Sequence, residues 1–160
     1  GKVFKATVKS ADGVKLTSGR ILAQGFGVAI KTVSKKYHVA DEETGHKQKM
    51  SKEEIDSLYT ECEIGMMVDH PGLVKMFSVH LCSSNMHIVQ ELMEGGELFD
   101  RILDRYAESY FTEKECARML KQLGEALAYL HDMGIAHRDL KVSAGASRSA
   151  RTTSSLNFIL

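Results

Sequence analysis

Two short runs of apolar and β-branched residues open the chain and predict a hairpin. Residues 2–8 and 26–33 each have the composition of a strand, and the residues between them are punctuated by glycine and serine. Two further apolar stretches, 73–79 and 86–92, are divided by residues 82–85, whose sequence Cys-Ser-Ser-Asn favours a turn. We therefore expect two hairpins, the first with an unusually long connecting loop.

Helix signals lie between and after these runs. Residues 51–54 read Ser-Lys-Glu-Glu, the form of a capping box, in which the serine oxygen and the glutamate each satisfy an unpaired amide at a helix start. We expect a helix over about 52–68, which stops before Pro71 because proline disfavours helical geometry in the preceding residue. A short helix over about 97–106 is expected after the second hairpin.

A second capping box, Thr-Glu-Lys-Glu at 112–115, begins a longer helix. Its apolar residues are spaced three and four apart and make one stripe: Cys116, Met119, Leu120, Leu123, Leu127 and Leu130. Gly134 supplies the C-terminal stop. The order of strands, helix, strands and helices predicts an α+β fold, in which a small sheet is followed by a helical part.

The end of the chain has a different composition. Residues 142–160 are rich in Ser and Ala, contain no acidic residue and show neither helical nor strand periodicity, so we expect a disordered or non-native tail. Val142-Ser143 can be encoded by a hexamer that matches the start of a spliceosomal intron. One hypothesis is therefore that the tail is translated intron, and the alternative is a genuine alternative terminus.

Composition narrows the classes of function. The 160 residues carry 21 Lys+Arg and 21 Asp+Glu, and this balance argues against a nucleic-acid partner. No apolar run approaches the ~18 to 20 residues that span a bilayer, and no signal peptide opens the chain, so we expect a soluble cytoplasmic protein without a membrane partner. The three cysteines have no paired spacing, and the seven histidines show no zinc-like pair on a helix face, so no metal site is predicted.

Two separate segments have the arrangement that phosphoryl transfer needs. Residues 28–31 read Val-Ala-Ile-Lys on the second predicted strand, where alternation puts Ala29 and Lys31 on one face. Residues 137–141 read His-Arg-Asp-Leu-Lys after the long helix. With both motifs present, the chain resembles the protein kinase family. The first motif alone is a weak signal, since any buried strand could end that way.

The resemblance assigns roles in the first part of the chain. It implies that Ala29 lies against the adenine base and that Lys31 reaches the phosphates of ATP. The carboxylate that positions the lysine is expected at Glu61, because it lies ten residues before Pro71, as in kinases of the calcium/calmodulin-dependent group. Glu63 is expected to point elsewhere. The alternative is that Glu61 is one more solvated glutamate of an acidic helix.

Residues 91–100, Glu-Leu-Met-Glu-Gly-Gly-Glu-Leu-Phe-Asp, resemble the hinge and the first C-lobe helix of the same group. The resemblance implies that the Glu91 carbonyl and the Met93 amide hydrogen-bond the adenine edge. It makes Gln90 the gatekeeper beside the base, and Glu97 the residue that faces the ribose or a substrate arginine. The paired glycines also fit an ordinary strand-to-helix turn.

In the His-Arg-Asp motif, the resemblance implies that Asp139 orients the substrate hydroxyl and accepts its proton. Lys141 neutralises charge that builds on the transferred phosphate. Magnesium is expected in the complete domain. However, Ala144 stands where the family has a magnesium-binding asparagine, and no Asp-Phe-Gly occurs anywhere in the chain.

Other positions also depart from the family pattern. Of the glycine-rich loop over the phosphates only Gly1 and Val3 remain as cofactor-binding candidates. Gly65 takes a helix position where the family stacks a large apolar side chain on Met76.

The resemblance covers residues 1–141. It implies a kinase N-lobe over about 1–92, built of a small antiparallel sheet and one regulatory helix, then a hinge over about 91–96 and the first helices of a truncated C-lobe over 97–141. The implied function is that of a Ser/Thr protein kinase fragment with ATP as cofactor and protein as substrate, and calcium or calmodulin regulation is possible by resemblance only. This chain alone is expected to be inactive. The alternative is a truncated, non-catalytic isoform that competes for partners.

Overall fold

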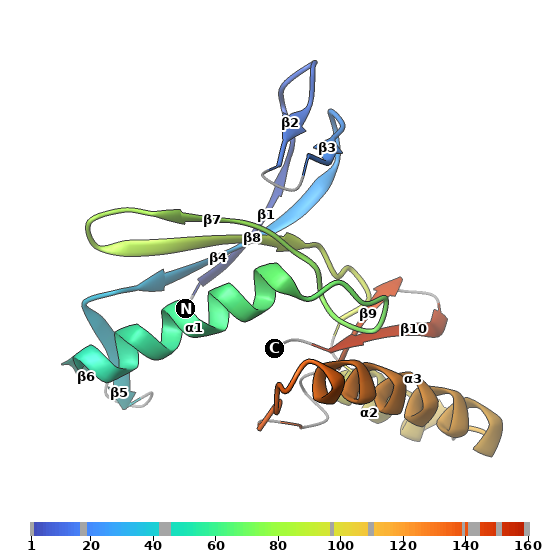
Figure 1. Cartoon of the computed structure of the whole chain (residues 1–160). Helices are drawn as coiled ribbons and strands as arrows, with labels where there is room; N and C mark the ends of the chain where they lie inside the picture. Colours follow the sequence, from blue (N-terminus) through green and yellow to red (C-terminus); the bar gives the residue numbers. More distant parts are fainter. Residues whose placement is uncertain are drawn as a thin grey trace. The chain divides into compact units, whose positions relative to one another are not determined.

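A computed structural model describes residues 2–16, 19–41, 46–96, 98–108, 111–138, 140, 145–149 and 152–158. The elements are, in chain order, β1 (Lys2–Thr7), β2 (Val14–Lys15), β3 (Ile21–Leu22), β4 (Gly27–Ser34), β5 (Tyr37–Asp41), β6 (His46–Lys49), α1 (Lys52–Met67), β7 (Met76–Leu81), β8 (Asn85–Glu91), α2 (Leu98–Glu108), α3 (Glu113–Asp132), β9 (Gly145–Ser149) and β10 (Thr152–Phe158) (Figure 1). They form two compact units. The first, here the sheet unit, is Gly1–Met67 with Met76–Glu91, and the second, the helical unit, is Val68–Lys75 with Leu92–Leu160.

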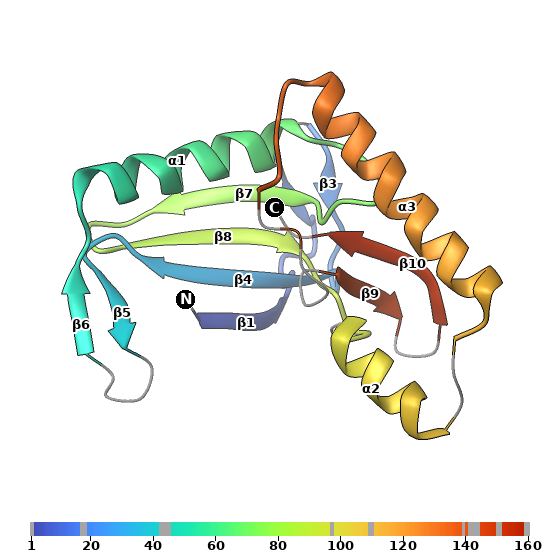
Figure 2. The ribbon, with the colours of Figure 1, turned by 90° about the horizontal axis from the view of Figure 1, so that it is seen from below.

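The sheet unit is built on four antiparallel strands in the order β1-β4-β8-β7. The predicted hairpins are β1 with β4 and β7 with β8, and both are confirmed. Helix α1 runs along one face of this sheet (Figure 2). Leu58 and Cys62 of α1 pack there against Met86 and Ile88 of β8, which are fully buried.

The long loop between β1 and β4 has structure of its own. It holds the small hairpin of β2 and β3, which the sequence analysis did not predict because each strand is only two residues long. Leu16 and Leu22 from this region pack with Val28 and Phe77 in a second cluster. This cluster lies on the sheet face opposite α1, because Val28 alternates with Ala29 along β4.

Strands β5 and β6 form a further antiparallel ribbon that was not predicted. Their sequences are largely polar and charged, so the alternation that identifies a half-buried strand is missing. They pair antiparallel along the backbone, with an irregularity between Val39 and Asp41.

Helix α1 begins at Lys52, where the capping box predicts its start. The Glu54 amide donates to Ser51 Oγ at 3.2 Å, and the Ser51 amide donates to Glu54 Oε2 at 2.7 Å. Both bonds of the capping box are therefore made. The helix ends at Met67, four residues before Pro71.

The helical unit contains α2 and α3. Helix α3 has the predicted capping box between Thr112 and Glu115, and Gly134 follows its end with φ of 73°, which favours glycine. Of the predicted apolar stripe only Leu130 is fully buried, whereas Leu120 is 67% exposed. Ala126, which lay outside the predicted stripe, is buried as well.

The segment Val68–Lys75, which follows α1 in the chain, packs against α3 within the helical unit. The Asp69 amide donates to Tyr129 Oη at 2.9 Å. The His70 ring stacks on the Tyr129 ring with centroids 5.1 Å apart. Gly72 lies so close to Ala126 that an added Cβ would meet the alanine methyl at 3.2 Å. One tyrosine therefore holds two consecutive residues of this segment.

The end of the chain differs from the predicted disordered tail. Strands β9 and β10 pair antiparallel, with an irregularity between Thr152 and Leu156, and β10 lies beside α3 (Figure 2). Strand pairing needs only backbone donors and acceptors, so a segment without apolar alternation can form it. Residue periodicity therefore gives no signal for this hairpin.

No helix within the described ranges is both long enough and apolar enough to cross a bilayer.

Candidate active site

The strand register assembles one group of candidate residues on a single face of the sheet. Ala29 pairs with Gln90, and Lys31 pairs with Val3 on one side and with Ile88 on the other. Because residues paired across strands share a face, Val3, Ala29, Lys31 and Gln90 all lie on the α1 side. Ala29 is only 6% exposed. The predicted common face of Ala29 and Lys31 is confirmed.

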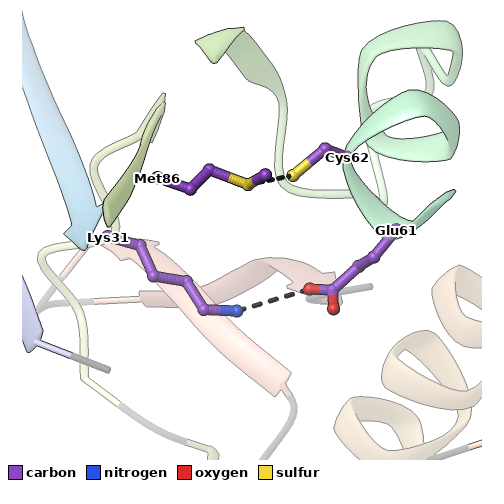
Figure 3. Close-up of polar contacts among 4 residues, drawn as sticks. All are labelled: Lys31, Glu61, Cys62 and Met86. Carbon is purple, nitrogen blue, oxygen red and sulfur yellow. Dashed lines mark hydrogen bonds and ion pairs between the residues drawn. The ribbon is translucent and has the colours of Figure 1, made fainter. Parts of the chain in front are cut away.

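An ion pair joins this face to helix α1 (Figure 3). Lys31 Nζ lies 3.4 Å from Glu61 Oε1, close enough for a hydrogen bond as well as charge attraction. The two side chains retain 31% and 39% exposure, so the ammonium group stays open to a solvent-borne anion. Glu61 is therefore held at the sheet, whereas Glu63 is exposed on the helix.

Cys62 fixes the turn of α1 that carries Glu61. Its thiol donates to the Met86 sulfur at 3.2 Å, and both residues lie in the core between α1 and β8 (Figure 3). Burial raises the pKa of Cys62 above its ordinary value, the neighbouring Glu61 raises it further, and Lys31 opposes this shift. The group stays a neutral thiol near pH 7. Its spacing of four from Leu58 puts both residues on the buried face of α1.

A second contact of α1 depends on the absence of a side chain. A Cβ at Gly65 would collide with the end of the Met76 side chain, which fills that space. Met76 begins β7 and pairs with Gln90, so it belongs to the same face as Ala29. The glycine lets a long side chain of the sheet lie directly against the helix backbone.

The chain leaves the sheet at the predicted hinge. Glu91 is the last residue of β8 and pairs with Val28, and Met93 follows in the connection to α2. Gly96 has φ of 73°, a conformation that few residues other than glycine adopt. Glu97 and Gly1 lie outside the described residues.

The predicted catalytic motif belongs to the helical unit. Arg138 has φ of 62°, the one positive φ among the described non-glycine residues. Such strained backbone concentrates at functional sites. Asp139 and Lys141 themselves lie outside the described residues, so their predicted roles stay predictions.

The arrangement in the sheet unit can hold a phosphorylated ligand with a flat base. Ala29 presents only a methyl group on this face of β4, and a cation two residues on can neutralise phosphate charge. Among the described residues, no three His, Cys, Asp or Glu side chains come together in a way that could hold a metal ion.

Comparison with known proteins agrees with these motifs. Residues 18–144 match the protein kinase domain family. A probable myosin light chain kinase of Dictyostelium discoideum is 48% identical over 85 residues, which cover 53% of this chain and 26% of that protein. Human calcium/calmodulin-dependent protein kinase type IV is 40% identical over 95 residues, which cover 58% of this chain and 20% of that protein.

Among solved structures, the crystal structure of Rad53 in complex with AMP-PNP matches with a TM-score of 0.63 at 23% identity. The match covers 85% of this chain and 31% of that one. It shows the fold, and the predicted α+β fold of kinase type is confirmed. The chain spans between about a fifth and a third of the length of these relatives.

Proposed function

The chain belongs to the protein kinase family, and we propose that it is the N-lobe and the start of the C-lobe of a Ser/Thr kinase of the calcium/calmodulin-dependent group. The complete protein binds ATP and transfers its γ-phosphate to hydroxyl groups of protein substrates. The observation that carries this proposal is the ion pair between Lys31 and Glu61, which joins β4 to α1. Calmodulin regulation is part of the proposal only because relatives bear that description.

In this proposal the nucleotide lies against the α1 side of the sheet. Val3 and Ala29 flank the adenine base, and Gln90 stands beside it as the gatekeeper. The Glu91 carbonyl accepts from the adenine amino group and the Met93 amide donates to a ring nitrogen. Such backbone bonds orient the base without requiring particular side chains.

Lys31 neutralises phosphate charge, and Glu61 keeps its ammonium group in place. A lysine on a flexible stem loses conformational entropy when it binds an anion, so a partner that already holds it reduces that cost. The pair thereby couples phosphate binding to the position of α1.

The second half of the proposed site is the catalytic loop. Asp139 accepts the proton of the substrate hydroxyl as that oxygen attacks the γ-phosphorus, and Lys141 stabilises the charge on the transferred group. Arg138, whose backbone has a left-handed conformation, precedes Asp139 and would turn the chain sharply at this point.

We infer that the 160-residue chain alone does not complete this reaction. Magnesium, when bound, would neutralise charge on the phosphates of ATP, and this family holds it with an asparagine and the aspartate of Asp-Phe-Gly. The chain does not supply the expected ligands, because Ala144 replaces the asparagine and Asp-Phe-Gly is missing. The replacement of that asparagine by Ala144 favours a second candidate function, a non-catalytic module that binds nucleotide or partners and competes with an active kinase.

A chimaera separates these possibilities. Residues 1–141 joined to the remaining C-lobe of human calcium/calmodulin-dependent protein kinase type IV should phosphorylate a basic peptide in the presence of ATP and magnesium. The same chimaera with Asp139→Asn should fall to background. A folded, ATP-binding chimaera no more active than its Asp139→Asn variant would contradict the proposed function.

A further inference from the structure

We propose that His80 and His87 form a binding site for a zinc-like divalent cation on the face of the sheet that points away from α1. The two histidines stand directly opposite each other on β7 and β8. They lie seven residues apart in the sequence and are brought together by the hairpin turn.

The register puts both imidazoles within reach of one ion. Residues directly opposite in an antiparallel pair share a face and have Cβ atoms about 4.5–5.5 Å apart. Zinc binds imidazole nitrogen at about 2.0–2.1 Å. Two rings that start at that Cβ separation can therefore both contact a cation placed between them.

Each ring is also held by a hydroxyl group. Thr32 Oγ1 lies 2.9 Å from His87 Nδ1, and Ser78 Oγ lies 3.0 Å from His80 Nε2. When these nitrogens donate to the hydroxyls, Nε2 of His87 and Nδ1 of His80 carry the lone pairs that a metal needs. A ligating histidine typically donates its other ring N–H in this way, which sets its tautomer and orientation.

The pair lies apart from the nucleotide face. Met86 and Ile88, the neighbours of His87 in β8, are buried against α1, so His87 alternates to the opposite face. Lys31 pairs with Ile88 and therefore shares the α1 side. Metal binding at the histidines should leave the contact between Lys31 and Glu61 in place.

The donor set selects the class of cation. Two neutral imidazoles suit Zn²⁺, Ni²⁺ and Cu²⁺, whereas Mg²⁺ and Ca²⁺ prefer oxygen ligands. No third His, Cys, Asp or Glu completes a ligand set within the described ranges, so water would fill the remaining positions. The expected site is a two-point chelate that ties β7 to β8.

Titration of the 160-residue chain with Zn²⁺, followed by calorimetry, tests the site. We expect one equivalent of Zn²⁺ to bind. His80→Asn or His87→Asn should weaken Zn²⁺ binding by about tenfold or more, because the ion then keeps only one of its two imidazole ligands. Thr32→Val should weaken binding by about 10- to 100-fold through loss of the orienting bond. His131→Asn, an exposed histidine on α3, is the matched control and should bind like the unchanged chain.

Three results would overturn the proposal. The first is unchanged Zn²⁺ affinity in the double variant His80→Asn/His87→Asn. The second is loss of binding in Cys82→Ser, because that would assign the ion to the exposed thiol at the hairpin turn. The third is equal affinity in concentrated urea, because the site requires paired strands. Far-UV circular dichroism of each variant establishes whether the sheet is retained.

Discussion

Lys31 of β4 and Glu61 of α1 meet across the gap between strand and helix, with Nζ 3.4 Å from Oε1. Among the described residues, Glu61 is the ion-pair partner of Lys31. The position of α1 over the sheet therefore decides whether the lysine has a partner.

Lys31→Met should weaken binding of an ATP analogue by about tenfold or more, because a hydrogen bond to a charged group contributes about 1.5–3 kcal/mol. Glu61→Gln should weaken it less, since the ammonium remains but loses the carboxylate that orients it. Calorimetric titration of the chain measures both. Glu63→Gln is the control, and an equal effect there would contradict a specific role for Glu61.

The contact between Gly65 and Met76 predicts a non-additive stability effect. Gly65→Ala should gain less than the roughly 1 kcal/mol of helix propensity, because the new methyl collides with Met76. In the Met76→Ala background, the same change should recover the full gain. Gly124→Ala is a matched control, since that helical glycine has no neighbour near its added Cβ. Urea unfolding of the unchanged chain, the two single variants and the double variant measures the coupling energy between Gly65 and Met76. Additive changes in unfolding free energy would contradict this prediction.

Cys62 should make stability depend on alkaline pH. Burial, and then Glu61, raise the pKa of its thiol in the folded state above the ordinary 9.0. Since the folded state holds this proton more tightly, the stabilisation is fully present below the unfolded pKa and is lost as pH rises through the folded pKa. Unfolding free energies from pH 7 upward should therefore fall less steeply in Cys62→Ala.

The same burial predicts an order of reactivity. Iodoacetamide should modify the exposed Cys82 well before Cys62 in the native chain, because Cys62 is both buried and a neutral thiol. Peptide mass spectrometry at timed intervals gives the order. Equal rates at both cysteines would show that α1 does not cover Cys62.

Tyr129 should anchor the segment Val68–Lys75 in two separable ways. Tyr129→Phe removes the bond from the Asp69 amide but keeps the ring against His70, so we expect a loss of about 0.5–1 kcal/mol. Tyr129→Ala should cost clearly more, because the ring contact is lost too. Hydrogen exchange at the Asp69 amide is the local readout. Unchanged exchange in Tyr129→Phe would contradict the anchor.

The unaltered chain should show no phosphoryl transfer to a basic peptide above the level of its Asp139→Asn variant. Both chains lack the magnesium ligands that the family uses. Loss of the proposed proton acceptor therefore causes no further loss of phosphoryl-transfer activity. Labelled ATP with magnesium provides the assay. Incorporation clearly above the Asp139→Asn level would show that other groups replace the missing ligands.

Local signals in the sequence were sufficient for most elements. The capping boxes at Ser51 and Thr112 place two helix starts, because each box depends only on residues three positions apart. The turn before Asn85 and the apolar runs around it likewise predict the second hairpin. The kinase motifs depend on residue identity alone, so the family could be inferred before any geometry.

Segments without a local pattern escaped prediction. The β5 and β6 ribbon is polar, and the β9 and β10 hairpin has no apolar alternation, so neither differs from a loop by periodicity. Of the apolar stripe on α3, the sequence could not tell that Leu130 is buried while Leu120 is exposed, because that depends on which elements cover each turn.

By itself, the sequence determined the starts of α1 and α3, the hairpins of β1 with β4 and β7 with β8, the kinase family and the candidates Lys31 and Glu61. Only the tertiary structure decided that Glu61 meets the lysine and is not one more solvated glutamate, that Met76 fills the space left by Gly65, and that two histidines face each other. The physical reason is the distance along the sequence over which each interaction acts. Capping and alternation act within a few residues, whereas these contacts join strands and a helix whose register is set by burial of the whole sheet unit.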